Sequence, residues 1–442
     1  MGRVEGERRS PIARSLISLT PPVERALLIG APLKRSADRH QIDEHLEELA
    51  RLADTAGAVV VGELTQRLDR PDPATYLGKG KIEELRSLVD AEQATLVIFD
   101  DELTPAQGRN VEEVTGKRVM DRAELILDIF ATRARTAEAK LQVELAQLEY
   151  LLPRLTRMWA HLEGQRGGIG LRGPGETQLE TDRRLINNRI RLLKDRLTDV
   201  ERARTVQRHS RRSAFRVSLV GYTNAGKSSI LRALSGADDI LVEDRLFATL
   251  DPLTREVELE GNTHVLLTDT VGFIRKLPHN LVASFRATLE EVTEADLLVH
   301  VIDGSHPAWE EQKAVVEQVL AEIGAGEKPV LFAFNKMDMV PLANRAPFME
   351  RVQNLLPGAV FLSVSEGHLN ELRGALVASV RASRPVSQVT LSATDGKLLA
   401  ELHRDAEVLD IRNDGANVVV EARLDQALAG RLRRAGARVS QR

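Results

Sequence analysis

The chain has 442 residues, of which 43% are hydrophobic and 29% charged, as is typical of a globular protein with two to four domains. It contains no cysteine, so disulfides, thiolate metal sites and cysteine nucleophiles are excluded. The net charge of −4 hides a basic segment, residues 164–216, with 14 Lys and Arg against 6 Asp and Glu. That segment either meets a polyanionic partner or is a solvated helix face.

Residues 1–23 are expected to be a flexible N-terminal extension. They lack the sustained apolar core of a signal peptide. No run of about 18 apolar residues occurs elsewhere in the chain, so no membrane span is predicted. We therefore expect a cytoplasmic protein, which also agrees with the lack of cysteine.

Short apolar runs alternate with helical patterns over residues 24–121. The runs are rich in Val, Ile and Leu, as in "AVVVGEL" and "ATLVIFD". Strands separated by helices pair in parallel, which predicts a small α/β domain. Lys79 and Lys81 lie at a predicted helix N-terminus, where they either bind an anion or are simply solvated.

Residues 122–213 have the pattern of a long helical hairpin. Apolar stripes run over residues 141–155, with a candidate kink at Pro153, and again over residues 185–197. Two such helices form an antiparallel pair with their apolar stripes together and their arginines outward. The glycine-rich loop between them, residues 164–175, is expected to be disordered or ordered by a partner.

The hairpin carries the residues best placed to contact an RNA backbone. Such contacts would make binding strongly dependent on salt. Trp159 and His161 precede the glycine-rich loop and are expected to pack or to cap a helix. The candidate RNA contacts are Arg183, Arg184, Arg189, Arg191 and Arg196.

Strands and helices alternate again over residues 214–384, where "LVGYTNAGKSSILRALSG" contains the strongest motif. Gly221 and Gly226 are followed by Lys227 and Ser228 in a G-x-x-x-x-G-K-S pattern between a strand and a helix. The backbone N–H groups of such a loop point at phosphate oxygens, and the helix dipole adds to their attraction. Lys227 would reach the β- and γ-phosphates and Ser228 would coordinate Mg²⁺. The motif predicts a nucleoside triphosphate site, with a structural glycine turn as the alternative.

The segment "FNKMD" indicates which base is bound. It follows the apolar run "PVLFAF" and supplies Asn335, Lys336 and Asp338. A carboxylate at this place accepts hydrogen bonds from both N1 and N2 of guanine, whereas adenine has no matching donors. A buried carboxylate without partners costs several kcal/mol, so the site is expected to prefer guanine strongly. Lys336 would lie over the base with its alkyl stem.

Two further segments are expected to contact the γ-phosphate and Mg²⁺. "LLTDTVGF" supplies Asp269, which can hold Mg²⁺ through water, and Gly272, whose N–H can meet the γ-phosphate. "LFATLDP" supplies Thr249 as a second Mg²⁺ hydroxyl. Both segments should loosen on hydrolysis, because they lose their phosphate contacts. Phe273 stands where many GTPases have a glutamine that orients water, so slow intrinsic hydrolysis is predicted.

Residues 385–442 read as strand, helix, two strands and helix, which predicts a small α+β domain without a chemical motif. The predicted fold class is therefore α/β. A P-loop GTPase domain with a mostly parallel sheet is preceded by the small α/β domain and its hairpin, and followed by this α+β domain.

The order and spacing of "GYTNAGKS", "FATLD", "DTVG", "NKMD" and "LSVSEG" resemble those of translation-factor-class GTPases. The wider context includes "GKGK", "VIFDDELTPAQGRNVEE" and "GGIGLRGPGETQLETDRR". With this context, the chain closely resembles the HflX family of ribosome-associated GTPases over residues 25–382. The resemblance implies binding of GTP and of the large ribosomal subunit with its rRNA, and splitting or rescue of stalled or idle ribosomes.

The resemblance also implies which residues contact the nucleotide, with Mg²⁺ on Ser228 and Thr249. Asn224 resembles the asparagine that binds a cation in K⁺-stimulated GTPases, and a loop-stabilising amide is the alternative. Two departures are Val364, where alanine is usual, and Leu253, where a hydroxyl residue is frequent. The candidate catalytic residues are Lys227, Thr249, Asp269 and Gly272. The full set of nucleotide contacts is Gly221, Tyr222, Thr223, Asn224, Ala225, Gly226, Lys227, Ser228, Phe247, Ala248, Thr249, Leu250, Asp251, Asp269, Thr270, Val271, Gly272, Asn335, Lys336, Met337, Asp338, Ser363, Val364 and Ser365.

Other functions stay open at this point. The leading hypothesis is a GTP-hydrolysing switch that acts on the ribosome as a monomer, with no DNA partner. An RNA-binding scaffold that keeps GTP for structure is one alternative, and a GTPase that times an RNA modification is another. ATP binding by the N-terminal domain is also conceivable, although that domain has no comparable glycine-rich phosphate motif.

Overall fold

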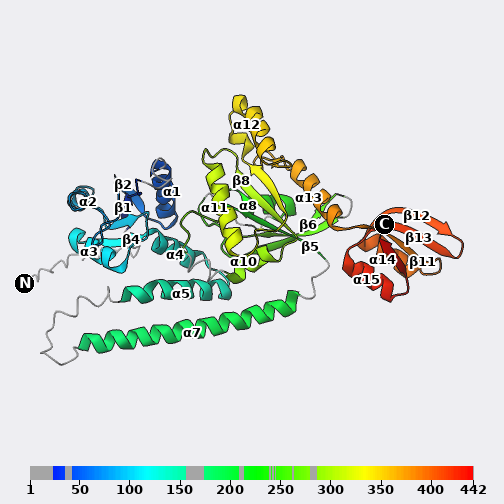
Figure 1. The fold of residues 1–442 in the computed structure, drawn as a ribbon, viewed down its shortest axis with the longest axis horizontal. Helices are drawn as coiled ribbons and strands as arrows, with labels where there is room; N and C mark the ends of the chain where they lie inside the picture. The colour runs from blue at the N-terminus through cyan, green and yellow to red at the C-terminus, as the bar shows by residue number, and fades with distance from the viewer. Residues whose placement is uncertain are drawn as a thin grey trace, which may run out of the picture.

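The computed structural model contains three sheets, one for each α/β or α+β unit expected from the sequence (Figure 1). Trp159, His161, most of the glycine-rich loop and nearly all of the N-terminal extension lie outside the residues that it describes. The described residues are 23–34, 42–155, 174–208, 214–237, 240, 243, 245–260, 263–278 and 286–441.

The N-terminal sheet has the strand order β2-β1-β3-β4, and every pair is parallel, as predicted. Helices α1 and α4 cover one face of this sheet, because Leu28 and Ile98 share a core with them. Leu27 and Phe99 face the opposite core, with α2 and α3. The strands are β1 (Arg25–Gly30), β2 (Val59–Thr65), β3 (Leu96–Phe99) and β4 (Arg118–Asp121), and the helices are α1 (Ile42–Thr55), α2 (Lys79–Ala91), α3 (Pro105–Thr115) and α4 (Arg122–Arg133).

The helical pattern that begins at residue 122 is not one long helix, which corrects the sequence-based expectation. The hydroxyl of Thr136 accepts a hydrogen bond from the Ala139 N–H and caps a new helix, α5 (Ala137–Leu151). Helix α4 instead packs on the N-terminal sheet, with Phe130 in its core. A 3₁₀ turn (Leu152–Arg154) follows α5, so the α-helix ends just before the proline predicted to kink it.

Helix α7 (Pro174–Arg208) lies antiparallel to α5 and packs against it, which forms the expected hairpin (Figure 1). Leu193 is fully buried, but Leu185 is 58% exposed, so the apolar stripe predicted for α7 is only partly covered. The reason is length: α7 has 35 residues, whereas α5 has 15.

The central sheet has the order β10-β9-β8-β5-β7-β6, and only the β6–β7 pair is antiparallel. The carboxyl ends of the parallel strands meet at one edge, which is where ligands bind in open α/β sheets. The strands are β5 (Phe215–Gly221), β6 (Leu253–Leu259), β7 (Thr263–Asp269), β8 (Leu297–Asp303), β9 (Val330–Asn335) and β10 (Val360–Phe361), and the helices are α8 (Lys227–Ser235), α10 (Arg286–Thr293), α11 (Trp309–Glu322), α12 (Leu342–Leu355) and α13 (Asn370–Ser383).

The C-terminal unit is an antiparallel sheet in the order β12-β13-β11-β14, with α14 and α15 contributing to its core. Strand β14 was not predicted, because its "RVSQ" sequence has no apolar run and pairs with β11 only through the tertiary fold. The elements are β11 (Val386–Ser392), α14 (Gly396–Asp405), β12 (Glu407–Asp414), β13 (Asn417–Arg423), α15 (Gln426–Arg434) and β14 (Arg438–Gln441).

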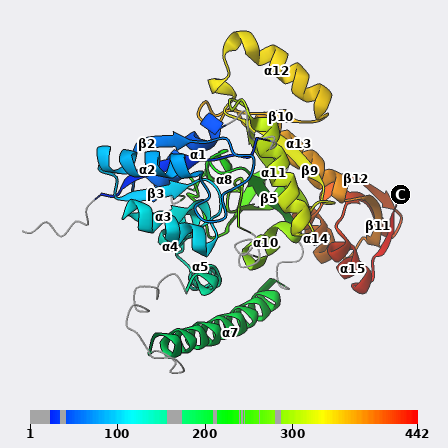
Figure 2. The same ribbon diagram turned by 60° about the vertical axis from the view of Figure 1, so that its left-hand side comes forward.

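The N-terminal unit packs against the central one, with α1 on the side that faces α8 and α11 (Figure 2). The two share a hydrophobic core, in which the rings of Phe130 and Phe247 meet edge to face with centroids 4.7 Å apart. Charged contacts surround this core: Lys276 lies 2.8 Å from Asp100, and Arg122 donates to the Arg275 carbonyl at 3.1 Å. Helix α1 of the N-terminal unit therefore lies beside the edge at which the parallel strands of the central sheet end.

Candidate functional site

The phosphate loop joins the end of β5 to the start of α8, and its backbone needs glycine. Gly226 has φ +99°, and a Cβ built there would lie 2.2 Å from Nδ2 of Asn335. A Cβ on Gly221 would lie 2.2 Å from the Val301 carbonyl oxygen. Asn224 also has a left-handed backbone, with φ +60°. The loop thus turns tightly enough to aim N–H groups at a common centre, as the motif predicts.

Lys227 lies at the first position of α8, beneath the loop. Its ammonium donates to the carbonyl oxygens of Gly221 at 3.1 Å and Tyr222 at 2.9 Å. Burial lowers the pKa of Lys227 to about 8, although the nearby carboxylate of Asp269 opposes this shift. An anion placed beside such a buried lysine strongly stabilises its charged form.

Three oxygen-bearing side chains converge next to Lys227. The Ser228 hydroxyl donates to Oδ2 of Asp269 at 2.6 Å and lies 2.8 Å from the Thr249 hydroxyl. Burial raises the pKa of Asp269, and its Oδ1 is buried without a hydrogen-bond partner in the described part of the chain. Hard oxygen donors and an unsatisfied carboxylate are what Mg²⁺ requires, so the residues present fit this ion. Bound there, Mg²⁺ would neutralise charge on the phosphates.

The predicted base-reading residues also lie together at the ends of β9 and β10. The Ser363 hydroxyl donates to Oδ1 of Asp338 at 2.7 Å and lies 3.0 Å from that of Ser365. Burial opposes ionisation of Asp338, but the Ser363 and Ser365 hydroxyls outweigh it and lower the pKa of this carboxyl below its usual value. The carboxylate is therefore held in its ionised, acceptor form.

Asn335 and Lys336 connect the base-reading residues to the phosphate loop. The Asn335 side chain donates to the Ala225 carbonyl at 3.0 Å and accepts from the Val364 N–H at 3.4 Å. Val364 thus contacts Asn335 through its backbone. Lys336 has a left-handed backbone, with φ +61°, and its ammonium lies 2.8 Å from Asp303.

A cavity of about 840 Å³ extends from the phosphate loop to these base-reading residues. Its lining includes Arg51, Asp54 and Thr55, which come from α1 of the N-terminal unit. Sequence reasoning missed these three, because no local pattern marks a helix that reaches a site more than 160 residues away. It also missed Asp303 and Arg245, which line the same cavity.

Several predicted contacts direct their side chains away from the cavity. The Asp251 carboxylate accepts hydrogen bonds from the Arg135 N–H at 3.0 Å and from the Thr136 hydroxyl, beside the start of α5. The Tyr222 hydroxyl contacts Glu48 of α1. The remaining residues of this group have buried side chains in the hydrophobic cores: Ala225, Phe247, Leu250, Val271 and Met337.

Phe273 is fully buried and is bonded to the phosphate loop through its backbone. Its N–H donates to the Gly221 carbonyl at 3.1 Å, and its carbonyl accepts from the Thr223 N–H at 2.7 Å. Gly272 lies so close to the loop that an added Cβ would come within 2.7 Å of the Thr223 Cα. The aromatic ring therefore belongs to the hydrophobic core.

The sequence-predicted basic residues differ in their surroundings. Arg189 pairs with Glu144 across the hairpin at 2.6 Å, and Lys81 pairs with Glu84 at 2.9 Å. The other candidate arginines of α7 are exposed: Arg183, Arg184, Arg191 and Arg196. Within the described residues, no helix combines the length and apolarity needed to traverse a bilayer.

Most of the chain matches known protein families. Residues 43–131 match the family described as GTP-binding GTPase N-terminal, and residues 133–211 match the GTP-binding GTPase Middle Region. Residues 216–336 match the family described as 50S ribosome-binding GTPase.

Individual relatives are similar over most of their length. The chain is 44% identical to the GTPase HflX of Magnetococcus marinus over 92% of this chain and 94% of the relative. It is 47% identical to the GTPase HflX of Escherichia coli over 83% of this chain and 85% of the relative. Among solved structures, a GTP-binding protein from Sulfolobus solfataricus in complex with GDP is 24% identical, with a TM-score of 0.44, over 81% of this chain and 98% of its own.

Identity at this level over most of both chains does not arise by chance, and the three matched families cover consecutive segments of this chain. The chain therefore belongs to the HflX family of GTPases, and it binds guanine nucleotide and hydrolyses GTP.

Proposed function

We propose that this GTPase binds the large ribosomal subunit in its GTP state, and separates or rescues ribosomes that are idle or stalled. The observation that carries the proposal is the match of residues 216–336 to the 50S ribosome-binding GTPase family. Membership of the HflX family supports it as well. The N-terminal unit and hairpin would act mechanically on the ribosome, under the control of the nucleotide.

GTP would lie with its phosphates at the loop from Gly221 to Ser228 and its base at Asp338. Lys227 and the loop N–H groups would hold the β- and γ-phosphates. The Ser228 and Thr249 hydroxyls would hold Mg²⁺, with Asp269 behind them. The 2.6 Å contact between Ser228 and Asp269 supports this arrangement, because it brings the two groups to one point.

Hydrolysis by the isolated protein is expected to be slow. No glutamine follows Gly272, and the ring of Phe273 is buried in the core. A partner such as the ribosome would then complete the positioning of water or the stabilisation of charge. Asn224 would hold K⁺ beside the phosphates, and a hydrolysis rate that is the same in K⁺ and Na⁺ would contradict this part of the proposal.

The hairpin offers a surface suited to RNA. The arginines along α7 are exposed, and a guanidinium binds a phosphate with two parallel hydrogen bonds. Each phosphate contact makes the slope of log affinity against log salt concentration more negative by roughly 0.7 to 0.9. The surface is formed by Arg183, Arg184, Arg191 and Arg196.

Co-sedimentation with purified large ribosomal subunits tests the proposal. We expect the protein to sediment with subunits in the presence of a non-hydrolysable GTP analogue, and far less with GDP, at two salt concentrations. Arg191→Ala and Arg196→Ala should reduce the salt dependence, whereas Arg86→Ala on α2 should not. Equal binding with both nucleotides would contradict a switch.

An RNA-binding scaffold is the alternative function, and one pair of variants separates it from the switch. Asp269→Asn and Ser228→Ala remove the proposed Mg²⁺ site. A scaffold would keep its ribosome association in these variants whatever nucleotide is offered, whereas a switch would lose the preference for the GTP analogue.

A further inference from the structure

Helix α1 is strongly acidic except for one arginine. Its sequence, IDEHLEELARLADT, has carboxylates at five positions and a single Arg, at position 51. Such a helix, placed against a phosphate site, would repel the nucleotide through most of its charged residues. Arg51 is the exception, because a cationic side chain close to the phosphates would attract the nucleotide.

The orientation of α1 is set by Glu48. Its carboxylate contacts the Tyr222 hydroxyl of the phosphate loop and the guanidinium of Arg122, which is fully buried. Arg275, which follows the Asp269–Gly272 segment, lies 3.8 Å from the same carboxylate. The helix is thus held at the loop by contacts that leave little freedom to rotate.

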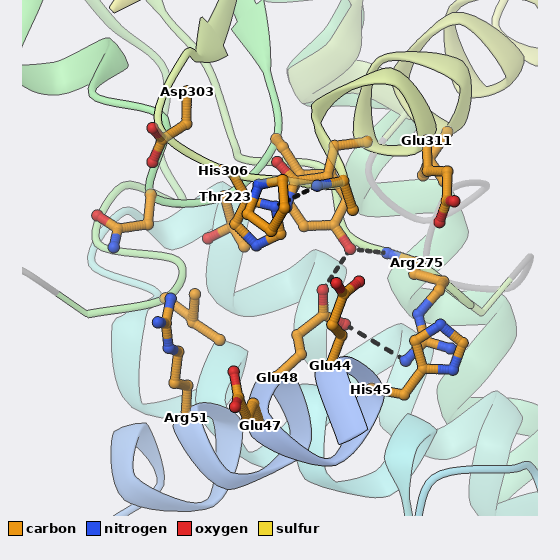
Figure 3. A pocket seen from close by; sticks show the side chains of 17 residues that line it. Glu44, His45, Glu47, Glu48, Arg51, Thr223, Arg275, Asp303, His306 and Glu311 are labelled. Carbon is orange, nitrogen blue, oxygen red and sulfur yellow. Dashed lines mark hydrogen bonds and ion pairs between the residues drawn. The ribbon is translucent and has the colours of Figure 1, made fainter. Parts of the chain in front are cut away.

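Arg51 lies three residues after Glu48 and so shares its helix face. Figure 3 shows Glu48 and Arg51 rising from α1 toward Thr223, His306 and Asp303 on the opposite wall. Arg51 lines two adjoining cavities, one of about 240 Å³ and the large nucleotide cavity of about 840 Å³. It shares both with Asn224 of the phosphate loop, and no other α1 residue lines both.

The Arg51 guanidinium also has no assigned partner. It is exposed, and among the described residues its side chain makes no ion pair or hydrogen bond. Asp303, on the opposite wall, is already paired with Lys336. An arginine is charged at every physiological pH, so this group carries a permanent positive charge into a site built for an anion.

We propose that Arg51 contacts the phosphates of GTP beside Asn224 and stabilises the transition state of hydrolysis, so that the N-terminal unit completes the active site. In that step, water adds to the γ-phosphorus. The bond from this phosphorus to the β–γ bridging oxygen breaks, with its electron pair remaining on GDP, and the proton of the water goes to the released phosphate. Negative charge that develops on the bridging oxygen is what the guanidinium would bind.

The inference rests on the proposed placement of GTP in this cavity. Arg245 lines the same cavity and is the competing candidate. Both side chains are exposed, and Arg245 also lines the small cavity around Lys227 and Ser228, but Arg245 lies outside any helix or strand, whereas Arg51 is on a helix held by buried charges. A group on a fixed helix loses less freedom when it reaches the transition state, which favours Arg51.

Single-turnover GTP hydrolysis by the full chain, with and without large ribosomal subunits, tests the inference. The variants are Arg51→Ala, Arg51→Lys and Arg245→Ala, with Arg86→Ala as the matched control, since Arg86 is an exposed arginine on α2 of the same unit. Affinity for GDP and for GDP with aluminium fluoride, which mimics the transition state, is measured for each variant by nucleotide fluorescence.

We expect Arg51→Ala to lower the hydrolysis rate and the aluminium fluoride affinity by about tenfold or more. Its GDP affinity and melting temperature should stay unchanged, and Arg51→Lys should recover part of the loss. The inference would be overturned if Arg51→Ala hydrolysed GTP within about twofold of the wild-type rate, or if it lost as much affinity for GDP as for the aluminium fluoride complex. It would also be overturned if only Arg245→Ala lowered the hydrolysis rate. Lys227→Ala is measured in parallel: if it still binds GTP normally, the proposed nucleotide site itself is wrong.

Discussion

Replacement of Arg122 by methionine should destabilise the contact between the N-terminal and central units. Arg122 is 1% exposed, and its guanidinium contacts Glu48 and Asp100, the latter at 2.8 Å. Burial opposes ionisation of Asp100, but Arg122, Lys276 and Arg275 outweigh it and hold the pKa of this carboxyl far below its usual value. Arg122→Met leaves both carboxylates buried with fewer cations.

The size of this effect follows from the charges that remain. Loss of one partner from a buried ion pair costs about 3–5 kcal/mol. Lys276, 2.8 Å from Asp100, and Arg275, 3.5 Å away, partly compensate, so we expect the lower end of that range, about 3 kcal/mol. Such a loss corresponds to roughly a hundredfold change in the folding equilibrium.

Urea unfolding followed by tryptophan fluorescence and by limited proteolysis measures the loss. Arg118→Met is the matched control on the same unit, because the Arg118 side chain is 55% exposed, and its surface pairs are worth less than about 1 kcal/mol. Adding Glu48→Gln to Arg122→Met should restore part of the stability, since Arg275 and Lys276 then remain to pair with Asp100. A loss below about 1 kcal/mol for Arg122→Met alone would refute the reasoning.

Three further predictions concern the central unit. Burial lowers the pKa of His300 to about 3, so below about pH 6.5 the unfolded chain binds a proton that the folded chain does not, and the free energy of unfolding should fall as the pH is lowered. Between pH 6.5 and 5.5, thermal unfolding should show a loss about 1 kcal/mol larger in the wild type than in His300→Phe. Asp338→Asn should lower the preference for GDP over ADP by about a hundredfold or more in calorimetry, and an unchanged ratio would show that this carboxylate does not read the base. Gly226→Ala should abolish GTP binding while the chain stays folded by circular dichroism, because its Cβ would lie 2.2 Å from the Asn335 amide; normal binding would mean that the loop opens freely.

The parts of the site that are contiguous in sequence could be predicted in advance. The loop from Gly221 to Ser228 forms its own turn, and its glycines are required by close approaches within a few ångström. Asp269 and Asn335 could be placed because each ends an apolar strand, and parallel strands end at a common edge. The direction of individual side chains was harder to predict. The Asp251 carboxylate, for example, is taken up by backbone and hydroxyl donors 115 and 116 residues away.

Element boundaries failed where the local pattern was ambiguous. The helical period continues past residue 134, and only the Thr136 cap and the packing of Phe130 divide the segment into α4 and α5. The sequence of strand β14 has no apolar alternation from which a strand could be predicted. The strand is stabilised by its backbone pairing with β11.

The sequence by itself determined the phosphate loop, the segment proposed to read guanine and the parallel order of strands, since each depends on short-range geometry and hydrophobic period. Only the tertiary structure decided that α1 lies against the nucleotide site, with Glu48 on Tyr222 across 174 residues and Arg51 beside Asn224. Charged residues on the surface of one unit look the same in sequence whether they face water or another unit. Their partners are set by how the two cores pack, which no local pattern records.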